Sequence, residues 1–253
     1  MTSELRIGPT LLLVLATALL AAAALALPGE TVTTKYVNDL FVFLDGAWRM
    51  LQGQVPNRDF HSALGPMAYV IPAAGHIVGG DMGAAMPTGM ALLIVAMAPA
   101  MAWIVASRLR IAIGAPFALY VVLLLAAPAN FGEGVTDLSF AMFYNRIGWA
   151  ALSVLLLLHL PPLRASATQR ALDAVCAVLL VALLVYTKMT YAAVAAVFFG
   201  FLLVFSPRRM DVFATGCLVL LLCGAIELVW RGSAGHVADL LQAARVSGAI
   251  SDP

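Results

Sequence analysis

Long uncharged runs alternate with short polar segments along almost the whole chain. Apart from a run at 60–80, they cover residues 7–29, 83–107, 111–132, 147–163, 174–187, 189–207 and 212–226. A helix needs about 20 mainly apolar residues to cross the hydrocarbon core of a bilayer. The pattern therefore predicts an all-α, polytopic integral membrane protein with about seven transmembrane helices, organised as one transmembrane domain over residues 1–253.

The composition agrees with this prediction. Of 253 residues, 63% are hydrophobic and 11% are charged, whereas a soluble domain is nearer to half apolar and a quarter charged. The formal net charge of +1 comes with neither a basic patch for nucleic acid nor an acidic tail. Cys176, Cys217 and Cys223 share no metal-ligand spacing, so we interpret them as packing residues and predict no metal site.

The first uncharged run has two interpretations. It follows Arg6 and is longer than the core of a usual secretory signal, which favours a retained first helix. It also ends in small residues, Ala22, Ala24 and Ala26, that are typical of a signal-peptidase site. In both cases the segment after Pro28 lies outside the membrane.

Arginines in the short connections predict how the helices are oriented. Three cytoplasmic turns are marked by arginine pairs at 108/110, 164/170 and 208/209, because Lys and Arg are enriched in short cytoplasmic loops. The first loop (about 28–83), the loop 130–146 and the turn at Lys188 then face outward. This orientation is incompatible with a full crossing by residues 64–79, whose prolines and glycines favour an interfacial or re-entrant helix. The alternative is an ordinary span there, with the N-terminus outside.

Residues 37–52 have the period of an amphipathic helix. The apolar stripe predicts a helix that lies on the membrane surface, with Trp48 near the headgroups. Asp39 falls nearly opposite this stripe, on the side of Gly46, where a carboxylate raised above the membrane could act on a headgroup or sugar. The simpler alternative, which helix statistics favour, is that Asn38 and Asp39 cap the helix N-terminus.

The same loop carries a set of short motifs. An acidic residue soon after the first span, a Gly-x-x-Pro turn and an Asp-Phe pair are formed by Asp39, Gly53, Pro56, Asp59 and Phe60. Together with the proline-started segment at 65–66, they resemble the first outer loop of GT-C-type membrane glycosyltransferases. Lipid A aminoarabinose transferases and protein O-mannosyltransferases are relatives in that group. The resemblance covers about residues 8–110, and the remainder is similar only as a general pattern of spans.

The resemblance implies an enzyme that transfers a sugar from a lipid-phosphate-linked donor to a glycan, lipid or protein acceptor. Asp39 matches the acidic position that acts in the family as base or acceptor-orienting group. Asp59 and His61 become candidates for substrate binding, although a lone loop histidine usually has no special role. We expect a bacterial inner membrane with the active side facing the periplasm or exterior, no nucleic-acid partner, and no cofactor beyond, at most, a divalent cation.

Two cations on the predicted outward side could hold the donor phosphate. Arg146 follows Tyr144 at the end of the loop 130–146, and Lys188 stands alone between two apolar runs. Ionisable residues at such positions are functional candidates, and cations can offset the charge on a leaving phosphate. We therefore add Tyr144, Arg146 and Lys188 to the substrate-binding candidates. The simpler alternatives are a headgroup contact for Arg146 and snorkelling for Lys188.

Departures from the family pattern leave other functions open. Many relatives have two adjacent acidic residues where this chain has Asn38-Asp39. They are also longer, so the chain is either a fragment that lacks their C-terminal part or a reduced relative. One alternative function is a transporter or flippase for lipid-linked substrates, although no internal repeat supports it. Another is a non-catalytic subunit of a membrane complex.

Overall fold

The computed structural model describes residues 7–30, 32–129, 132–134 and 136–250, and most of these residues are helical. Its helices are α1 (Ile7–Ala26), α2 (Val37–Leu51), α3 (Met67–Gly79), α4 (Met82–Arg108), α5 (Ile111–Ala126), α6 (Phe143–Leu158), α7 (Ala167–Thr187), α8 (Met189–Phe205), α9 (Arg209–Trp230) and α10 (Ser233–Ile250). Within this described part there is no strand, only isolated bridges at Pro56–Phe60 and Ala129–Leu138. The all-α prediction is confirmed.

Several of these helices have the length and composition of membrane spans. Among the described residues, four helices are long and apolar enough to cross a bilayer, namely α1, α4, α7 and α9. The apolar helices α5, α6 and α8 are shorter, with 16, 16 and 17 residues. The four long helices confirm the prediction of a helical membrane protein. The count of about seven spans stays a prediction.

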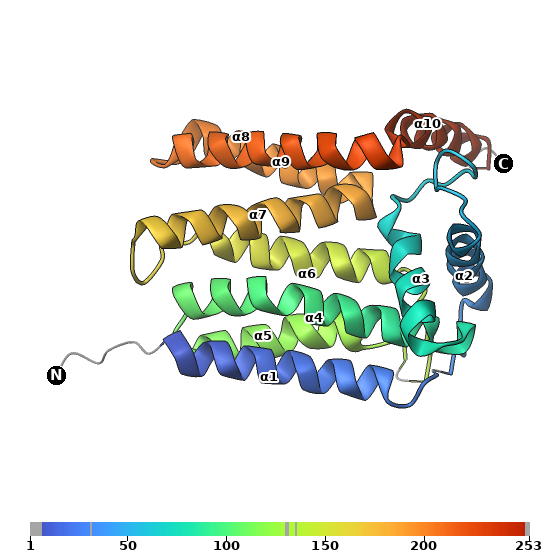
Figure 1. Cartoon of the computed structure of the whole chain (residues 1–253), viewed down its shortest axis with the longest axis horizontal. Helices are drawn as coiled ribbons and strands as arrows, with labels where there is room; N and C mark the ends of the chain where they lie inside the picture. The colour runs from blue at the N-terminus through green and yellow to red at the C-terminus, as the bar shows by residue number, and fades with distance from the viewer. Residues whose placement is uncertain (1–6, 31, 130–131, 135, 251–253) are drawn as a thin grey trace.

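The helices separate into a bundle and a group at one of its ends (Figure 1). Helices α1 and α4 to α9 run along the long axis of the molecule, whereas α2, α3 and α10 gather at one end. We call this end, which also holds residues 127–129, 132–134, 136–142 and Lys188, the loop end. The opposite end holds the connections 109–110, 159–166 and 206–208 and is called the arginine end.

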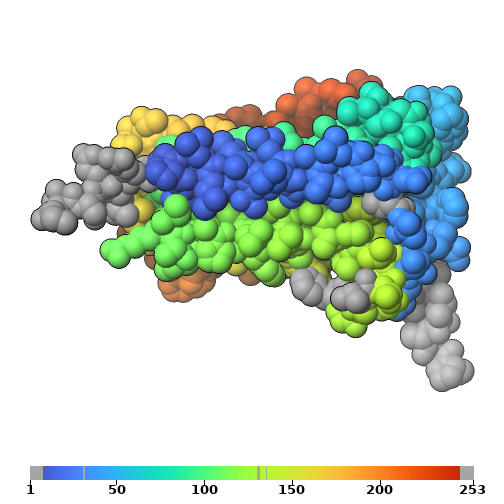
Figure 2. Space-filling model, turned by 90° about the horizontal axis from the view of Figure 1, so that it is seen from below, coloured from blue at the N-terminus to red at the C-terminus, as the bar shows by residue number. Residues whose placement is uncertain are grey.

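Helix α4 lies at the centre of the bundle. Its buried side chains include Met90, Ile94, Ile104 and Val105, each 1% exposed or less. Helix α1 lies along one face, beside α5, with α2 and α3 at the end (Figure 2). By contrast, the outer helices carry exposed apolar side chains, such as Val197 on α8 and Leu220 on α9. An apolar exterior of this kind matches lipid as the surrounding medium.

Helix α3 crosses the loop end and does not follow the bundle (Figure 1). The N–H of Gly65, just before α3, donates to the carbonyl oxygen of Thr187 at the end of α7, at 3.1 Å. Further along, Gly75 packs so closely on α4 that an added Cβ would lie 1.9 Å from the Ala85 carbonyl oxygen. Glycine therefore allows backbone-to-backbone contact here. Helix α3 thus bridges the end of α7 and the start of α4.

Candidate functional site

The segment before α2 is joined to the loop before α6. Lys35 pairs with Glu133 and lies 3.3 Å from Asp137, while the Tyr36 hydroxyl donates to Glu133 at 2.6 Å. The hydrogen bond between Lys35 and Glu133 raises the pKa of Lys35 and lowers that of Glu133. Backbone pairing supports the same junction, since the Thr34 N–H donates to the Leu138 carbonyl at 2.9 Å. The start of α2 is thereby held against the start of α6.

Lys188 joins the α7–α8 connection to the first turn of α6. Its Nζ donates to Oδ1 of Asn145 at 3.2 Å and lies 4.8 Å from the centre of the Tyr144 ring. The Tyr191 hydroxyl lies 3.2 Å from both the carbonyl oxygen and Oδ1 of Asn145. Lys188 is half-buried. This position differs from a snorkelling lysine, whose amine would extend freely into water.

Asp39 begins the face of α2 that packs on the rest of the protein. Phe43, Gly46 and Ala47 on this face are buried, and the Phe43 ring lies 5.9 Å from that of Tyr144. Asp39 itself is exposed, and its charge acts on the phenol of Tyr144. This side of α2 turns towards α3 and α6, and the position of the Asp39 carboxylate relative to the membrane stays a prediction.

The prediction that Asn38 and Asp39 cap α2 by hydrogen bonds is wrong. The N-cap residue of α2 is Tyr36, in the left-handed region at φ 56°, and no side chain makes a capping hydrogen bond. Asp39 lies inside the first turn, where a carboxylate still interacts favourably with the helix dipole. Its side-chain oxygens make no hydrogen bond or ion pair with any described residue, so they are free to accept one from a substrate.

Arg146 is a buried charge without a hydrogen-bond partner. The residue is 2% exposed, and none of its three side-chain nitrogens is bonded to a described group. Its guanidinium carbon lies 5.4 Å from the centre of the Phe140 ring. Burying an unpaired charge is costly, and a guanidinium presents five N–H donors. Arg146 therefore places a buried guanidinium in the first turn of α6 that no described residue hydrogen-bonds.

We call Asp39, Tyr144, Asn145, Lys188 and Tyr191 the Asp39–Lys188 cluster. Tyr144 interacts with both charged members of the cluster. The charge of Asp39 acts on the Tyr144 phenol, and the Lys188 ammonium lies over the Tyr144 ring. The cluster therefore contains one exposed carboxylate and one half-buried ammonium group.

A second polar group at the loop end is organised by Asp239 of α10. Its side chain is 5% exposed and lies 2.6 Å from Nδ1 of His61. It also accepts hydrogen bonds at 2.9 Å from Nδ2 of Asn57 and from the Ser62 N–H. Burial raises the pKa of Asp239, but the hydrogen bonds from these donors lower it by more. The pKa of Asp239 therefore lies below its usual value. Asp239 thus fixes α10 to the loop and orients the exposed ring of His61.

His61 lines a cavity of about 380 Å³ between α2, α3 and the loop that precedes α3, which we call the His61 cavity. Its lining residues are Val42, Asp45, Gly46, Arg49, Asp59, Phe60, His61 and Tyr69. Arg49 pairs with Asp45 at 2.7 Å, and Asp59 accepts from the Val55 N–H at 2.7 Å. The Arg58 guanidinium holds the pKa of Asp59 below its usual value. The cavity therefore presents the carboxylates of Asp45 and Asp59 beside a positioned histidine.

The structure places all six predicted site residues at the loop end but divides them between two groups. Asp39, Tyr144 and Lys188 belong to the Asp39–Lys188 cluster, with Arg146 buried one residue beyond Asn145. Asp59 and His61 instead line the His61 cavity. Asp39 and Gly46 share one side of α2, so about 10 Å of helix separates the two groups.

Sequence reasoning missed Asn145, Tyr191 and Asp239. Asn145 lies between Tyr144 and Arg146, and Tyr191 lies three residues after Lys188, but their contact with each other joins segments 46 positions apart in the chain. Asp239 lies in α10, and the composition of the segment after Arg231 could have predicted this helix. Within the described ranges, no three His, Cys, Asp or Glu side chains converge as metal ligands.

Comparison with known proteins adds no assignment. No protein-family profile matches the chain, and neither the curated proteins nor the solved structures contain a significant match.

Proposed function

We propose that the protein is a membrane glycosyltransferase of the GT-C type, which transfers a sugar from a lipid-phosphate-linked donor to an acceptor at the loop end. One observation carries the proposal. Asp39, Tyr144 and Lys188 were selected as site residues from separate parts of the sequence; Lys188 lies over the Tyr144 ring, and the charge of Asp39 acts on the Tyr144 phenol. A carboxylate with free oxygens and a half-buried cation at the same end of the protein suit transfer between a hydroxyl and a phosphate ester.

The proposal includes a topology. Helices α1 and α4 to α9 cross the membrane, the loop end faces the exterior, and α2 and α3 lie at that interface. Support comes from the parallel course of these helices (Figure 1) and from the arginines that gather at the opposite end. The 16 residues of α5 and α6 extend roughly 24 Å. Their flanking residues supply the remainder of a hydrocarbon core about 30 Å thick.

The proposed reaction has defined roles for the residues of the Asp39–Lys188 cluster. An acceptor hydroxyl donates a hydrogen bond to Asp39, and its oxygen attacks the anomeric carbon of the donor sugar. The bond between that carbon and the phosphate oxygen breaks, and the hydroxyl proton passes to Asp39. Lys188 neutralises the charge that develops on the departing lipid phosphate. The lipid phosphate and the glycosylated acceptor are the products.

Arg146 has an electrostatic role in this proposal. Because its side chain is 2% exposed, it does not contact a headgroup directly. An unpaired charge in a medium of low dielectric nevertheless acts over several ångströms. Its potential attracts the donor phosphate to the loop end and adds to that of Lys188. The headgroup-contact alternative for Arg146 does not agree with this burial.

A reconstitution experiment separates the proposed function from its alternatives. The full chain is placed in liposomes with a polyprenyl-phosphate sugar that carries a radiolabel on the sugar. A transferase moves the label from the lipid to a hydroxyl acceptor, or to water as free sugar. A flippase leaves the label on the lipid but changes its leaflet. A non-catalytic subunit does neither, and that result with a full panel of donor sugars would contradict the proposal.

A further inference from the structure

A second cavity lies at the arginine end, far from the proposed transfer site. Its volume is about 510 Å³, and it is formed by the ends of α6 and α8 and the starts of α7 and α9. Phe199, Leu202 and Leu218 contribute apolar surface to it. Its charged lining residues are Arg108, Arg170, Arg208, Asp173 and Asp211. The cavity therefore combines charged groups with apolar walls.

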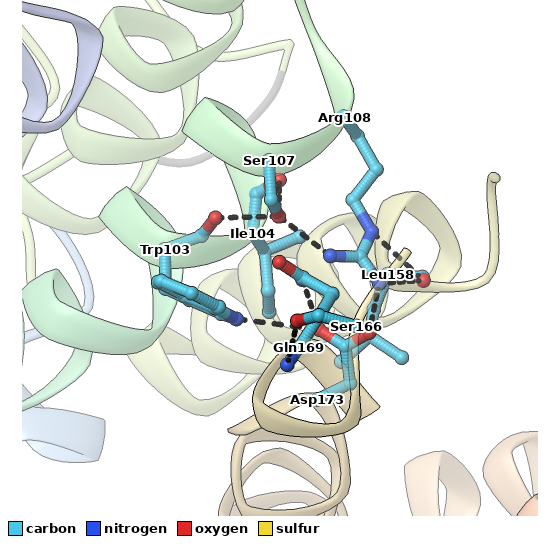
Figure 3. Close-up of polar contacts among 8 residues, drawn as sticks. All are labelled: Trp103, Ile104, Ser107, Arg108, Leu158, Ser166, Gln169 and Asp173. Carbon is cyan, nitrogen blue, oxygen red and sulfur yellow. Dashed lines mark hydrogen bonds and ion pairs between the residues drawn. The ribbon is translucent and has the colours of Figure 1, made fainter. Parts of the chain in front are cut away.

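Two of these charges neutralise each other (Figure 3). The Arg108 side chain is 1% exposed, and its Nη2 lies 2.6 Å from Oδ2 of Asp173. The other carboxylate oxygen accepts from Nε2 of Gln169 at 2.8 Å and from the Trp103 indole at 3.3 Å. Arg108 also donates twice to the Leu158 carbonyl, at the C-terminus of α6. The Arg108–Asp173 pair lines the cavity but does not bind a ligand, because its donors and acceptors are already hydrogen-bonded within the protein.

The remaining charges favour an anion. Arg170 and Arg208 are exposed, and neither guanidinium forms an ion pair with any residue the structure describes. Asp211 offsets one of them, which leaves one net positive charge in the cavity. Helix α9 also begins here, at Arg209, with no side chain capping its N-terminus. Its free amides and the positive end of its dipole add to the attraction for an anion.

The side chain of His159 gives a separate indication that a ligand binds in this cavity. Nε2 of His159 is buried without a hydrogen-bond partner, and His159 lines the same cavity. Its ring packs edge-on against Phe198 and Phe199, with centroids 5.1 and 5.9 Å away. Buried polar atoms in proteins are nearly always hydrogen-bonded. A polar group of a ligand that entered the cavity would satisfy this atom.

We propose that this cavity binds one anionic phospholipid, with the phosphate between Arg170 and Arg208 and an acyl chain against Phe199, Leu202 and Leu218. A soluble anion would use only the charged part, whereas a phospholipid matches the apolar walls as well. Basic pockets between helices on the cytoplasmic side are sites for anionic headgroups. Exposed apolar side chains on α8 and α9, such as Phe205 and Phe213, continue the path for the chain. The inference rests on the proposed topology but does not depend on sugar transfer.

The test compares lipid binding by matched variants of the full chain in detergent. Wild-type protein should retain dioleoyl phosphatidylglycerol in native mass spectra at least tenfold better than the neutral phosphatidylcholine. Arg170→Gln/Arg208→Gln should lose this preference. The control Arg110→Gln/Arg164→Gln removes the same charge from the same end, from exposed residues that do not line the cavity. It should bind as the wild type does.

Two further binding measurements test whether the ligand occupies this cavity and whether it is a lipid or a free phosphate. Ala214→Trp fills the cavity without changing its charge, so it should weaken phosphatidylglycerol binding as strongly as the arginine variant does. Inorganic phosphate should neither bind with comparable affinity nor displace the lipid. The proposal is overturned if both arginine double variants lose binding equally, if Ala214→Trp binds normally, or if phosphate alone occupies the site.

Discussion

Nζ of Lys188 lies 3.2 Å from Oδ1 of Asn145, and this contact joins the α7–α8 connection to the first turn of α6. The two residues are 43 positions apart in the chain. Tyr191 contacts the same amide from the other side. Lys188 is therefore held in one place with its charge directed into the loop end, which a phosphate-binding role requires.

Replacement of Lys188 should weaken donor binding more than it disturbs the fold. We expect Lys188→Gln to raise KM for a polyprenyl-phosphate sugar about 10- to 100-fold, because a hydrogen bond to a charged group contributes about 1.5–3 kcal/mol. Lys188→Arg keeps the charge and should recover much of the loss. Steady-state kinetics at varied donor concentration check this. An unchanged KM in Lys188→Gln would remove Lys188 from the donor site.

The close contact of α3 with α4 gives a stability prediction. In Gly75→Ala the new methyl group would meet the Ala85 carbonyl, so we expect a loss of about 1–3 kcal/mol from overpacking. Gly200→Ala is the matched control, because nothing lies within 4 Å of its added Cβ. There, alanine should be neutral or stabilise α8 by up to about 1 kcal/mol. Thermal denaturation in detergent compares the two, and equal melting temperatures would contradict the packing described for α3.

Docking of α10 should depend on pH through Asp239. Its pKa is lowered in the folded protein, so the stabilisation is complete above the usual value of 3.8 and disappears as the pH falls below it, through the lower folded value. Hydrogen-exchange protection of residues 233–245, corrected for intrinsic rates, should follow this course. Asp239→Asn should show weak protection with no such acid transition. An identical acid transition in that variant would assign the effect to another group.

The topology proposal is tested by labelling single cysteines in a variant whose native cysteines are replaced by alanine. Gln54→Cys and Asp81→Cys lie on either side of α3, and both should react from outside with an impermeant maleimide. Ala165→Cys at the arginine end should react only after the membrane is opened. If Gln54→Cys and Asp81→Cys react from opposite sides, α3 crosses the membrane and the proposed count of spans is wrong.

Much of the helical architecture follows from the sequence because lipid imposes a simple rule on it. Uncharged runs such as 83–107 and 189–207 correspond closely to α4 and α8, since a backbone in hydrocarbon must form its hydrogen bonds within a helix. The amphipathic pattern at 37–52 also gave α2 with nearly correct ends. Local composition decides these features.

The site was less predictable because it depends on contacts between distant segments. The period of α2 locates Asp39 relative to Gly46, but only the packing of Gly46 against Tyr69 shows that this side faces the protein. Similarly, His61 looks like an isolated loop histidine until α10 brings Asp239 within 2.6 Å of it. Such pairings need the tertiary fold.

The central proposal depends most directly on Asp39, so sugar transfer by Asp39→Asn is the deciding measurement. Asn keeps the shape of the side chain but cannot accept a proton, and we expect transfer to fall by about 10²- to 10⁴-fold. Because Asp39 is exposed and makes no hydrogen bond to a described residue, only its interaction with the helix dipole is lost, and the protein should be destabilised by no more than about 1 kcal/mol. Glu30→Gln, which removes an exposed charge from the same loop, should transfer normally. Near-normal transfer by a folded Asp39→Asn variant would contradict the proposed mechanism.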